Sequence, residues 1–389
     1  MKKKISNFFL ILIFPFSFFS CNEEKAPFKD SIITCFDGIK NGDEKGIDCG
    51  GGCSDFCPIQ NSLEGDIYLR TSLKSSVEYT ITGPLIIRDG ASLDIPAGMT
   101  LKVAPNRNAY IVITQGAKIY AYGTEENPII ITSASDNPQP GDWGGIIICG
   151  KAPINNGDLS RSEVGDIFYG GNEPNDSSGF IRHFTVEYTG ATFRNVSTFS
   201  GISFFGVGSY TTVNNVQSLN SLGDGFKFYG GNVNATGLVT TNSSRNGLSI
   251  QDGWFGQIEK CYQSGIEETG ISISENTSTD SANIREVSLI GNNTQQALNY
   301  GDGRGIVNFE NIYTSNFSLG IKVDGDEAGL GIEANEFTVS TIQFDNPSIN
   351  FMQTNYTGNN QSFYSEGTTT GAGNNASLPD WAINWVRGY

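Results

Sequence analysis

The sequence predicts an all-β protein: a right-handed parallel β-helix (solenoid) preceded by a small N-terminal segment stapled by disulfides. Helical periodicity is nearly absent before the last dozen residues, and short β-rich runs end at Gly, Asn, Asp or Ser. Beyond residue 180, three sequence registers also repeat in phase. An antiparallel sandwich would explain the strands and the glycines, but it would not explain repeats that stay in phase.

The first register is a tetrad that begins with glycine and continues with alternating apolar residues. The tetrads start at Gly201, Gly225, Gly247, Gly270 and Gly320, with steps of 24, 22, 23 and 50 residues, the last spanning two coils. Stacked coils place like residues over like. We therefore expect Ile202, Phe226, Leu248 and Ile271 to form one internal column.

The second register is a pair of apolar residues three positions apart, and the third is a corner residue four positions after each pair from Val213/Val216 onward. Corners in a β-helix favour Asn and Gly, which accept a positive φ at low cost. The pairs are Ile181/Phe184, Val213/Val216, Ala235/Leu238, Ile258/Cys261, Ile284/Val287 and Phe309/Ile312, and the corners are Asn220, Asn242, Gly265, Gly291 and Asn316. A fixed period of 22–26 residues is typical of a parallel β-helix whose coils wind right-handed.

The N-terminus predicts an exported lipoprotein. Three lysines precede an apolar run from Phe8 to Phe19, which at 12 residues is shorter than the roughly 20 that a membrane-spanning helix needs. The tripeptide before Cys21 resembles a bacterial lipobox, although Phe18 stands where Leu is usual. The resemblance implies a signal peptide over residues 1–20, diacylglycerol on Cys21 and an acidic tether over residues 21–33. Asn22 to Lys25 resembles the stretch that sends Bacteroidota lipoproteins to the exterior of the outer membrane.

The charge of the chain argues against nucleic acid as a partner. The formal net charge is −17, and removal of residues 1–20 with their three lysines leaves −20. Nucleic acid and anionic lipid surfaces both select basic patches. The membrane partner is therefore reached through the lipid, and the remaining partner classes are a polysaccharide or another envelope protein.

Residues 34–60 form a Cys-rich module that is too small to bury a core of its own. Cys35, Cys49, Cys53 and Cys57 predict two disulfides, with three connectivities open, because zinc sites favour C-x2-C and both short spacings here are x3. Glycines among acidic and amide side chains also suit a calcium ion. Its ligands would be Asp37, Asn41, Asp43 and Asp48; a solvated turn cluster is the competing interpretation. Cys149 and Cys261 are expected to be buried thiols.

The solenoid is predicted to span residues 66–377, with opening coils from Leu85 to Ser133. An irregular, proline-containing loop insertion over residues 135–178 is a natural place for function. Residues 378–389 predict a short helix that caps the open end of the solenoid, because Trp381 and Trp385 are four apart and Asp380 can cap it.

Three segments carry a resemblance to poorly characterised β-helix lipoproteins of Bacteroidota. They are Gly123-Thr-Glu-Glu-Asn-Pro-Ile-Ile-Ile-Thr, Pro140-Gly-Asp-Trp-Gly-Gly-Ile-Ile-Ile, and Gly223-Asp-Gly-Phe-Lys-Phe-Tyr-Gly-Gly-Asn-Val-Asn. The similarity covers most of residues 66–389, and the Cys-rich module also resembles one behind the lipid anchor of such proteins. Relatives carry a longer Asp-rich segment after the coil that contains Val239; here it is only Asn246 to Trp254. The resemblance implies a fold and a location, but no reaction.

The residues do not predict a particular enzyme. Asp-Asp is absent from the sequence, and His183, the only histidine, is expected to face outward. Lys227 beside Asp224, and Lys322 beside Asp324, offer the ingredients of a lyase but equally describe a solvated outer face. The expected function is therefore a non-catalytic binding or structural module. The alternative is a carbohydrate-active enzyme, a polysaccharide lyase or a glycoside hydrolase, which rests on fold analogy alone.

Two further sets of residues are candidates for binding and modification. Trp143, Tyr169 and Trp254 lie beside glycines in loop-like contexts and are expected to form a ligand platform. Ser31 and Ser281 lie in Asp-Ser-Ile and Asp-Ser-Ala triplets, which resemble acceptor sites for O-linked glycans in Bacteroidota; chance matches to so short a pattern are the alternative.

Overall fold

A computed structural model describes residues 35, 49, 51–53, 61–105, 108–155, 157–193, 197–293, 295–301, 303–347, 349–356, 358 and 363–389. The chain divides into two units, residues 1–59 and 60–389. In the first unit Cys35 and Cys53 form a disulfide, with their Cα atoms 5.5 Å apart. Cys49 is disulfide-bonded as well, whereas Cys57 lies outside the described residues.

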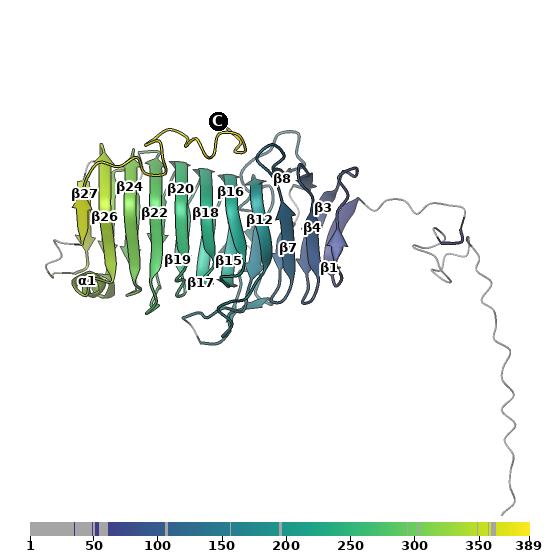
Figure 1. The fold of residues 1–389 in the computed structure, drawn as a ribbon, viewed down its shortest axis with the longest axis horizontal. Coiled ribbons are helices and arrows are strands. Elements are labelled where there is room, and N and C mark those ends of the chain that lie inside the picture. Colours follow the sequence, from purple (N-terminus) through teal and green to yellow (C-terminus); the bar gives the residue numbers. More distant parts are fainter. Residues whose placement is uncertain are drawn as a thin grey trace, which may run out of the picture. The chain divides into compact units, whose positions relative to one another are not determined.

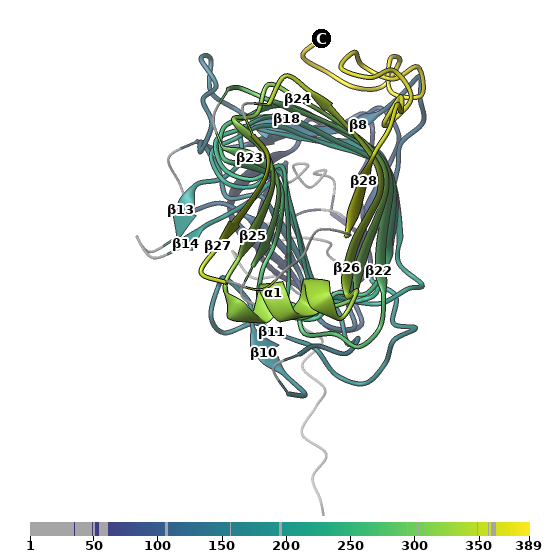
Figure 2. The same ribbon diagram turned by 90° about the vertical axis from the view of Figure 1, so that its left-hand side faces the viewer.

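The second unit is a right-handed parallel β-helix of about 11 turns, as the sequence predicted (Figure 1). Its coils run over three faces, visible nearly end-on in Figure 2. The first face holds β2 (Thr71–Ser72), β4 (Ser92–Ile95), β7 (Lys118–Tyr122) and the N-terminal halves of β12 (Gly179–Glu187), β16 (Thr212–Ser221), β18 (Asn234–Ser243), β20 (Gln257–Ile266), β22 (Ala282–Gly291), β24 (Val307–Ser315) and β26 (Phe337–Asp345).

The second face holds β5 (Thr100–Val103), β8 (Ile129–Ser133) and the C-terminal halves of the same long strands. The third face holds β6 (Ile111–Ile113), β9 (Ile146–Cys149), β15 (Ile202–Val207), β17 (Phe226–Gly231), β19 (Leu248–Gln251), β21 (Thr269–Ile273), β23 (Gln296–Gly301), β25 (Leu319–Asp324) and β27 (Ile349–Thr354). Strands β1 (Ser62–Ile67) and β3 (Thr80–Ile87) cover the second and third faces of the opening coils, and β28 (Tyr364–Glu366) pairs with β26.

The predicted internal column is confirmed. Ile202 pairs with Phe226, Phe226 with Leu248, and Leu248 with Ile271 along the third face. Each of these side chains is at most 1% exposed. The same column continues in both directions, through Ile146 and Ile111 toward the N-terminus and through Leu298, Ile321 and Phe351 toward the C-terminus.

The predicted corners are confirmed except at one position. Asn220, Asn242, Gly265 and Asn316 all have positive φ, between 53° and 67°. Gly291 does not. The register between β20 and β22 shifts at Ser264/Ile266, so the left-handed residue in that coil is Asn293.

A second row of left-handed residues, which the sequence did not reveal, lies inside each apolar pair. Its members are His183, Asn215, Gly237, Lys260, Glu286, Asn311 and Thr341. Each separates the first face from the second. The two apolar residues that flank it therefore both point into the core although they are three positions apart, which explains the spacing of the pairs.

The insertion over residues 135–178 is less separate from the solenoid than expected. It contributes β9 to the third face and then folds back as the hairpin of β10 (Ser160–Arg161) and β11 (Phe168–Tyr169). Beneath the hairpin, apolar side chains on the outside of the third face form a second core that includes Val112, Ile147, Cys149 and Phe205. Both Cys149 and Cys261 are buried free thiols, as predicted. A smaller hairpin joins β13 (Thr192–Phe193) and β14 (Ser197–Thr198).

The predicted C-terminal helix is wrong. Residues 371–389 form a succession of turns, which we call the C-terminal strap, and it runs back along the second face instead of closing the end of the solenoid (Figure 1, yellow). Trp385 is 1% exposed, the backbone N–H of Ala372 donates to Ser288 Oγ at 3.0 Å, and Arg387 pairs with Glu187. The one helix among the described residues, α1 (Asp326–Glu333), lies between β25 and β26 and was not predicted.

Candidate functional site

The aromatic residues expected to form a ligand platform lie inside the protein. Trp143 and Trp254 are 0% exposed and Tyr169 is 4% exposed. The indole N–H groups donate to the backbone oxygens of Glu187 and Val233, at 2.8 and 3.1 Å, as buried tryptophans usually require. Because a sugar stacks on an accessible ring face, the structure does not support this expectation.

Lys227 is also buried, which corrects the expectation of a solvated outer face there. Its Nζ bonds to the Glu163 carboxylate, which reaches it from the β10–β11 hairpin, and lies 3.9 Å from Asp224 Oδ2. Burial raises the pKa of Glu163, and the charge of Lys227 opposes that rise. Asp224 accepts further bonds from Ser249 Oγ and the Asn246 N–H, at 3.0 and 3.1 Å. This network holds the hairpin against the third face. Lys322, by contrast, pairs with Asp324 at 2.7 Å on a partly exposed surface.

The outer surface of the first face carries two long rows of exposed and half-buried side chains. Cross-strand pairing aligns these rows over the seven strands from β7 to β24, about 29 Å at 4.8 Å per strand. We call them the first-face strip. The first row is Tyr120, Phe180, Thr212, Asn234, Gln257, Asn283 and Asn308; the second is Tyr122, Arg182, Asn214, Thr236, Glu259, Arg285 and Glu310.

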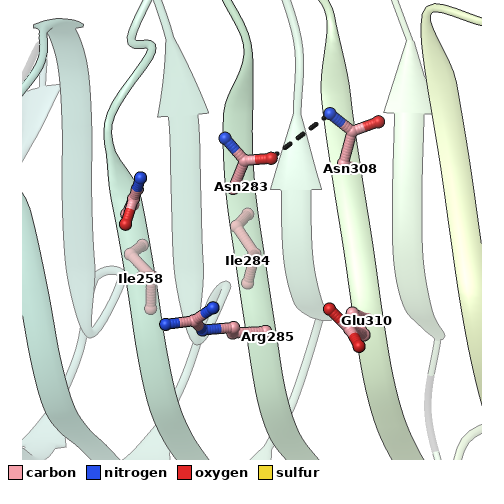
Figure 3. Close-up of a pocket in the computed structure, with 7 residues that line it drawn as sticks. Ile258, Asn283, Ile284, Arg285, Asn308 and Glu310 are labelled. Carbon is pink, nitrogen blue, oxygen red and sulfur yellow. Dashed lines mark hydrogen bonds between the residues drawn. The ribbon is translucent and has the colours of Figure 1, made fainter.

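A groove of about 290 Å³ lies in the strip over β20, β22 and β24. Amide side chains line one side of it: Gln257, Asn283 and Asn308. Asn308 Nδ2 donates to Asn283 Oδ1 at 3.3 Å, and Thr338 Oγ1 donates to Asn308 Oδ1 at 2.7 Å. Figure 3 shows Asn283 and Asn308 toward one end of the strands and Arg285 and Glu310 further along them. The groove therefore presents several hydrogen-bond donors and acceptors at regular intervals.

The charges at the groove largely offset one another. Arg285 Nη2 lies 3.1 Å from Glu259 Oε2, and this hydrogen bond raises the pKa of the guanidinium. Glu310 follows Arg285 in the same row and is exposed. The site thus combines neutral amides with one cation placed between two carboxylates.

Three aromatic rings lie at the other end of the strip. Tyr120 and Tyr122 are 6.1 Å apart between ring centroids with planes 3° from parallel, and Phe180 lies 5.7 Å from Tyr122. Tyr122 is 52% exposed and Phe180 39%. We call Tyr120, Tyr122 and Phe180 the aromatic trio. Sequence reasoning missed these residues, although the Tyr-x-Tyr alternation at 120 and 122 places both rings on one side of a strand.

The three-faced coils match a known family of β-helix proteins. The model of a pectate-lyase-like β-helix domain matches residues 65–386 of this chain. The chain belongs to this family. Pectate-lyase-like β-helix proteins are thus the relatives of the whole solenoid, from its opening coils to the C-terminal strap.

Solved structures show more distant likenesses to this pectate-lyase-like β-helix protein. Full-length tailspike protein 2 of the Escherichia coli O157:H7 bacteriophage CBA120 is 12% identical, with a TM-score of 0.34, over 71% of this chain and 37% of the tailspike. The catalytic domain of a family-87 α-1,3-glucanase, in complex with tetrasaccharides, is 11% identical, with a TM-score of 0.22, over 79% of this chain and 64% of that domain. The chain thus spans less than two thirds of each. The search of curated proteins gave no match.

Several predicted sites of this pectate-lyase-like β-helix protein lie outside the described residues: Cys21, Ser31 and the calcium candidates Asp37, Asn41, Asp43 and Asp48. Within the described part of the chain, His, Cys, Asp and Glu side chains form no group of three that would hold a metal ion. There is likewise no helix in that part long and apolar enough to span a membrane. Ser281 is exposed immediately before β22, and its glycosylation stays a prediction.

Proposed function

We propose that this protein is a non-catalytic, glycan-binding lipoprotein that binds a polysaccharide through the groove of the first-face strip. The main support for the proposal is the row of amide side chains at Gln257, Asn283 and Asn308, with one amide in each coil. Each amide both donates and accepts hydrogen bonds, as sugar hydroxyls do. The row repeats at about 4.8 Å, a distance comparable with one sugar unit of an extended polysaccharide.

The carboxylates beside the amides favour binding over hydrolysis. A glycosidase needs one carboxyl whose environment keeps it protonated near neutral pH, usually by burial in apolar surroundings. Glu310 is exposed to water, and Glu259 is paired with the cation Arg285. Neither carboxyl therefore has the apolar, buried surroundings that such an acid requires, whereas both can accept hydrogen bonds from sugar hydroxyls.

The proposal is tested by affinity electrophoresis of the mature protein through gels that contain a single polysaccharide. The panel holds β-mannan, arabinoxylan, β-1,3-glucan, polygalacturonate and alginate. We expect at least one polymer to retard the wild type and Asn292→Ala, a matched control at an exposed asparagine outside the strip. Asn283→Ala and Asn308→Ala should migrate freely. Equal retardation of all variants, or of none, contradicts the proposal.

The enzymatic alternative is tested with the same polymers. Incubation with the wild type should release neither reducing ends nor the unsaturated products of a lyase. If products accumulate and Glu259→Gln or Glu310→Gln abolishes them, the first face is an active site and the non-catalytic proposal is wrong.

We also propose that Cys21 anchors the protein to the outer membrane, facing the exterior. The motif around Cys21 and the basic, apolar N-terminus support this location. Cys21→Ala should then appear in the soluble fraction and incorporate no labelled lipid, while the wild type is membrane-bound and accessible to protease added to intact cells. Lipid incorporation into Cys21→Ala would exclude this residue as the anchor.

A further inference from the structure

The aromatic trio and the groove lie on the same two outward rows, although their residues are far apart in sequence. Phe180 belongs to the row of Asn283, and Tyr122 belongs to the row of Arg285. From β12 to β22 there are four strand steps, or about 19 Å. We infer, on the basis of the proposed function, that both bind one uncharged polysaccharide chain that runs along the solenoid axis.

The rings of the trio suit the apolar face of a sugar. Aromatic side chains normally bury their faces, and large exposed apolar groups in a cluster mark an interaction site. Here Tyr122 and Phe180 are 52% and 39% exposed, and their planes are 27° from parallel. The trio therefore offers an accessible aromatic surface on the open side of β7 and β12, where the C–H groups of a sugar ring can stack.

The surface between the trio and the groove leaves room for a chain. Arg182 follows Tyr122 in the second row, and beyond it lie Thr212, Asn214, Asn234 and Thr236, which are short, polar and at least partly exposed. They continue the pattern of hydrogen-bonding groups at one pair per coil. A polymer that stacks on the trio can thus reach the groove across polar side chains, with Arg182 as a hydrogen-bond donor beside the trio.

The charges of the strip favour an uncharged ligand. The two rows contain two cations, Arg182 and Arg285, and two anions, Glu259 and Glu310. Arg285 is already hydrogen-bonded to Glu259. A polyuronate would bring one negative charge per sugar to a strip without surplus positive charge, on a protein whose net charge is −17. Such like-charge contact is unfavourable.

The test compares a long polymer with a short oligosaccharide of the same linkage. Titration calorimetry is performed with the neutral polymer that retards the wild type, and with its trisaccharide, which spans the groove but not the strip. We expect Tyr122→Ala and Phe180→Ala to weaken binding of the polymer about tenfold or more and to leave binding of the trisaccharide unchanged, because only the polymer engages both ends. Tyr122→Phe should bind normally, since it keeps the ring.

The controls separate this inference from the proposed function. Tyr68→Ala removes a ring that is 66% exposed outside the strip and should have no effect; melting temperatures show whether each variant is folded. If Asn283→Ala loses binding but the trio variants do not, or if only polygalacturonate and alginate bind, the inference is wrong and the groove proposal stands. If no polymer of the panel binds, both are wrong.

Discussion

His183 was expected to face water, but residues distant in the sequence bury its side chain. It occupies a left-handed corner with φ of 44° and is 6% exposed. Its ring forms a T-shaped pair with Trp385 of the C-terminal strap, with centroids 5.9 Å apart, and its Nε2 lies 2.9 Å from Asn215 Nδ2. The sequence around β12 gives no sign of this burial, because the covering residue is some two hundred positions away.

The buried histidine makes stability depend on pH. Burial lowers the pKa of His183, although Gly123 and the carboxylates of Glu125 and Glu126 oppose the shift. The unfolded chain therefore takes up a proton near pH 6.5 while the folded protein resists it, so stability is fully present above about pH 6.5 and is lost as the pH falls below it. Urea midpoints should drop more between about pH 7.5 and 5.5 for the wild type than for His183→Gln. An equal drop in both would mean that His183 is not the group responsible.

Substitutions at Leu248 test whether the internal column of the third face is packed as described. It is 0% exposed and pairs with Phe226 on one side and Ile271 on the other. Leu248→Asp places an unpaired charge between two apolar neighbours, which costs several kcal/mol, a large part of the stability of a typical domain. We expect no cooperative unfolding transition at neutral pH by circular dichroism. Leu248→Met, which conserves volume, should lose less than about 1.5 kcal/mol. A stable Asp variant would contradict the register of the third face.

At the scale of the elements, the sequence predicted those features of a coil that recur with the same type of residue. The tetrads and the apolar pairs recur because every coil must fill the same interior. The corner row that includes Asn220 and Asn242 recurs mainly as Asn or Gly. The corner between the first and second faces could not be predicted from the sequence, because His, Lys, Glu and Thr occupy it as well as Asn and Gly. Its left-handed geometry is imposed by the core residues on either side and not by the intrinsic preference of the corner residue.

Substitutions at Asn242 test the row of corners that the sequence predicted correctly. Its φ is 53°, and its Nδ2 donates to Asn220 Oδ1 of the previous coil at 3.0 Å. Asn242→Gly keeps the conformation and loses one exposed hydrogen bond, so the change in unfolding free energy should be small. Asn242→Val should cost about 1–2 kcal/mol, because a β-branched residue resists positive φ. Urea denaturation measures both; identical midpoints for the Gly and Val variants would contradict a left-handed corner.

The candidate site was harder to predict than the coils. Glycine-flanked tryptophans suggest exposed loops, yet glycine here serves close packing: a Cβ on Gly145 would lie 2.0 Å from the Ser200 oxygen, and Trp143 is enclosed nearby. The groove and the trio depend on which strands become neighbours. Because β8 and the insertion together separate β7 from β12 by more than fifty residues, nothing local in the sequence pairs Tyr120 with Phe180.

At the scale of the whole molecule, the C-terminal strap alters a basic property of solenoids. Coils normally contact only their neighbours, so stability is a sum of local terms. The strap instead spans several successive coils, of which only immediate neighbours pair directly. Arg387 bonds to Glu187 and Gln217, and Tyr389 bonds to Thr241 and Ser264. Near its start, Ala372 bonds to Ser288. A local opening in any of these coils therefore also breaks a contact with the strap.

These links also decide when the strap forms. They join residues between 84 and 200 positions apart, and the face on which the strap docks exists only after the coils have stacked. Contacts absent from the transition state slow unfolding without speeding folding. Removal of residues 371–389 should therefore leave the refolding rate nearly unchanged and accelerate unfolding, as measured by stopped-flow fluorescence over a range of urea concentrations. Slower refolding with unchanged unfolding would place the strap in the nucleus. If the strap slows unfolding in this way, the folded chain owes part of its lifetime to the height of the unfolding barrier, so its durability is a matter of rate as well as of equilibrium.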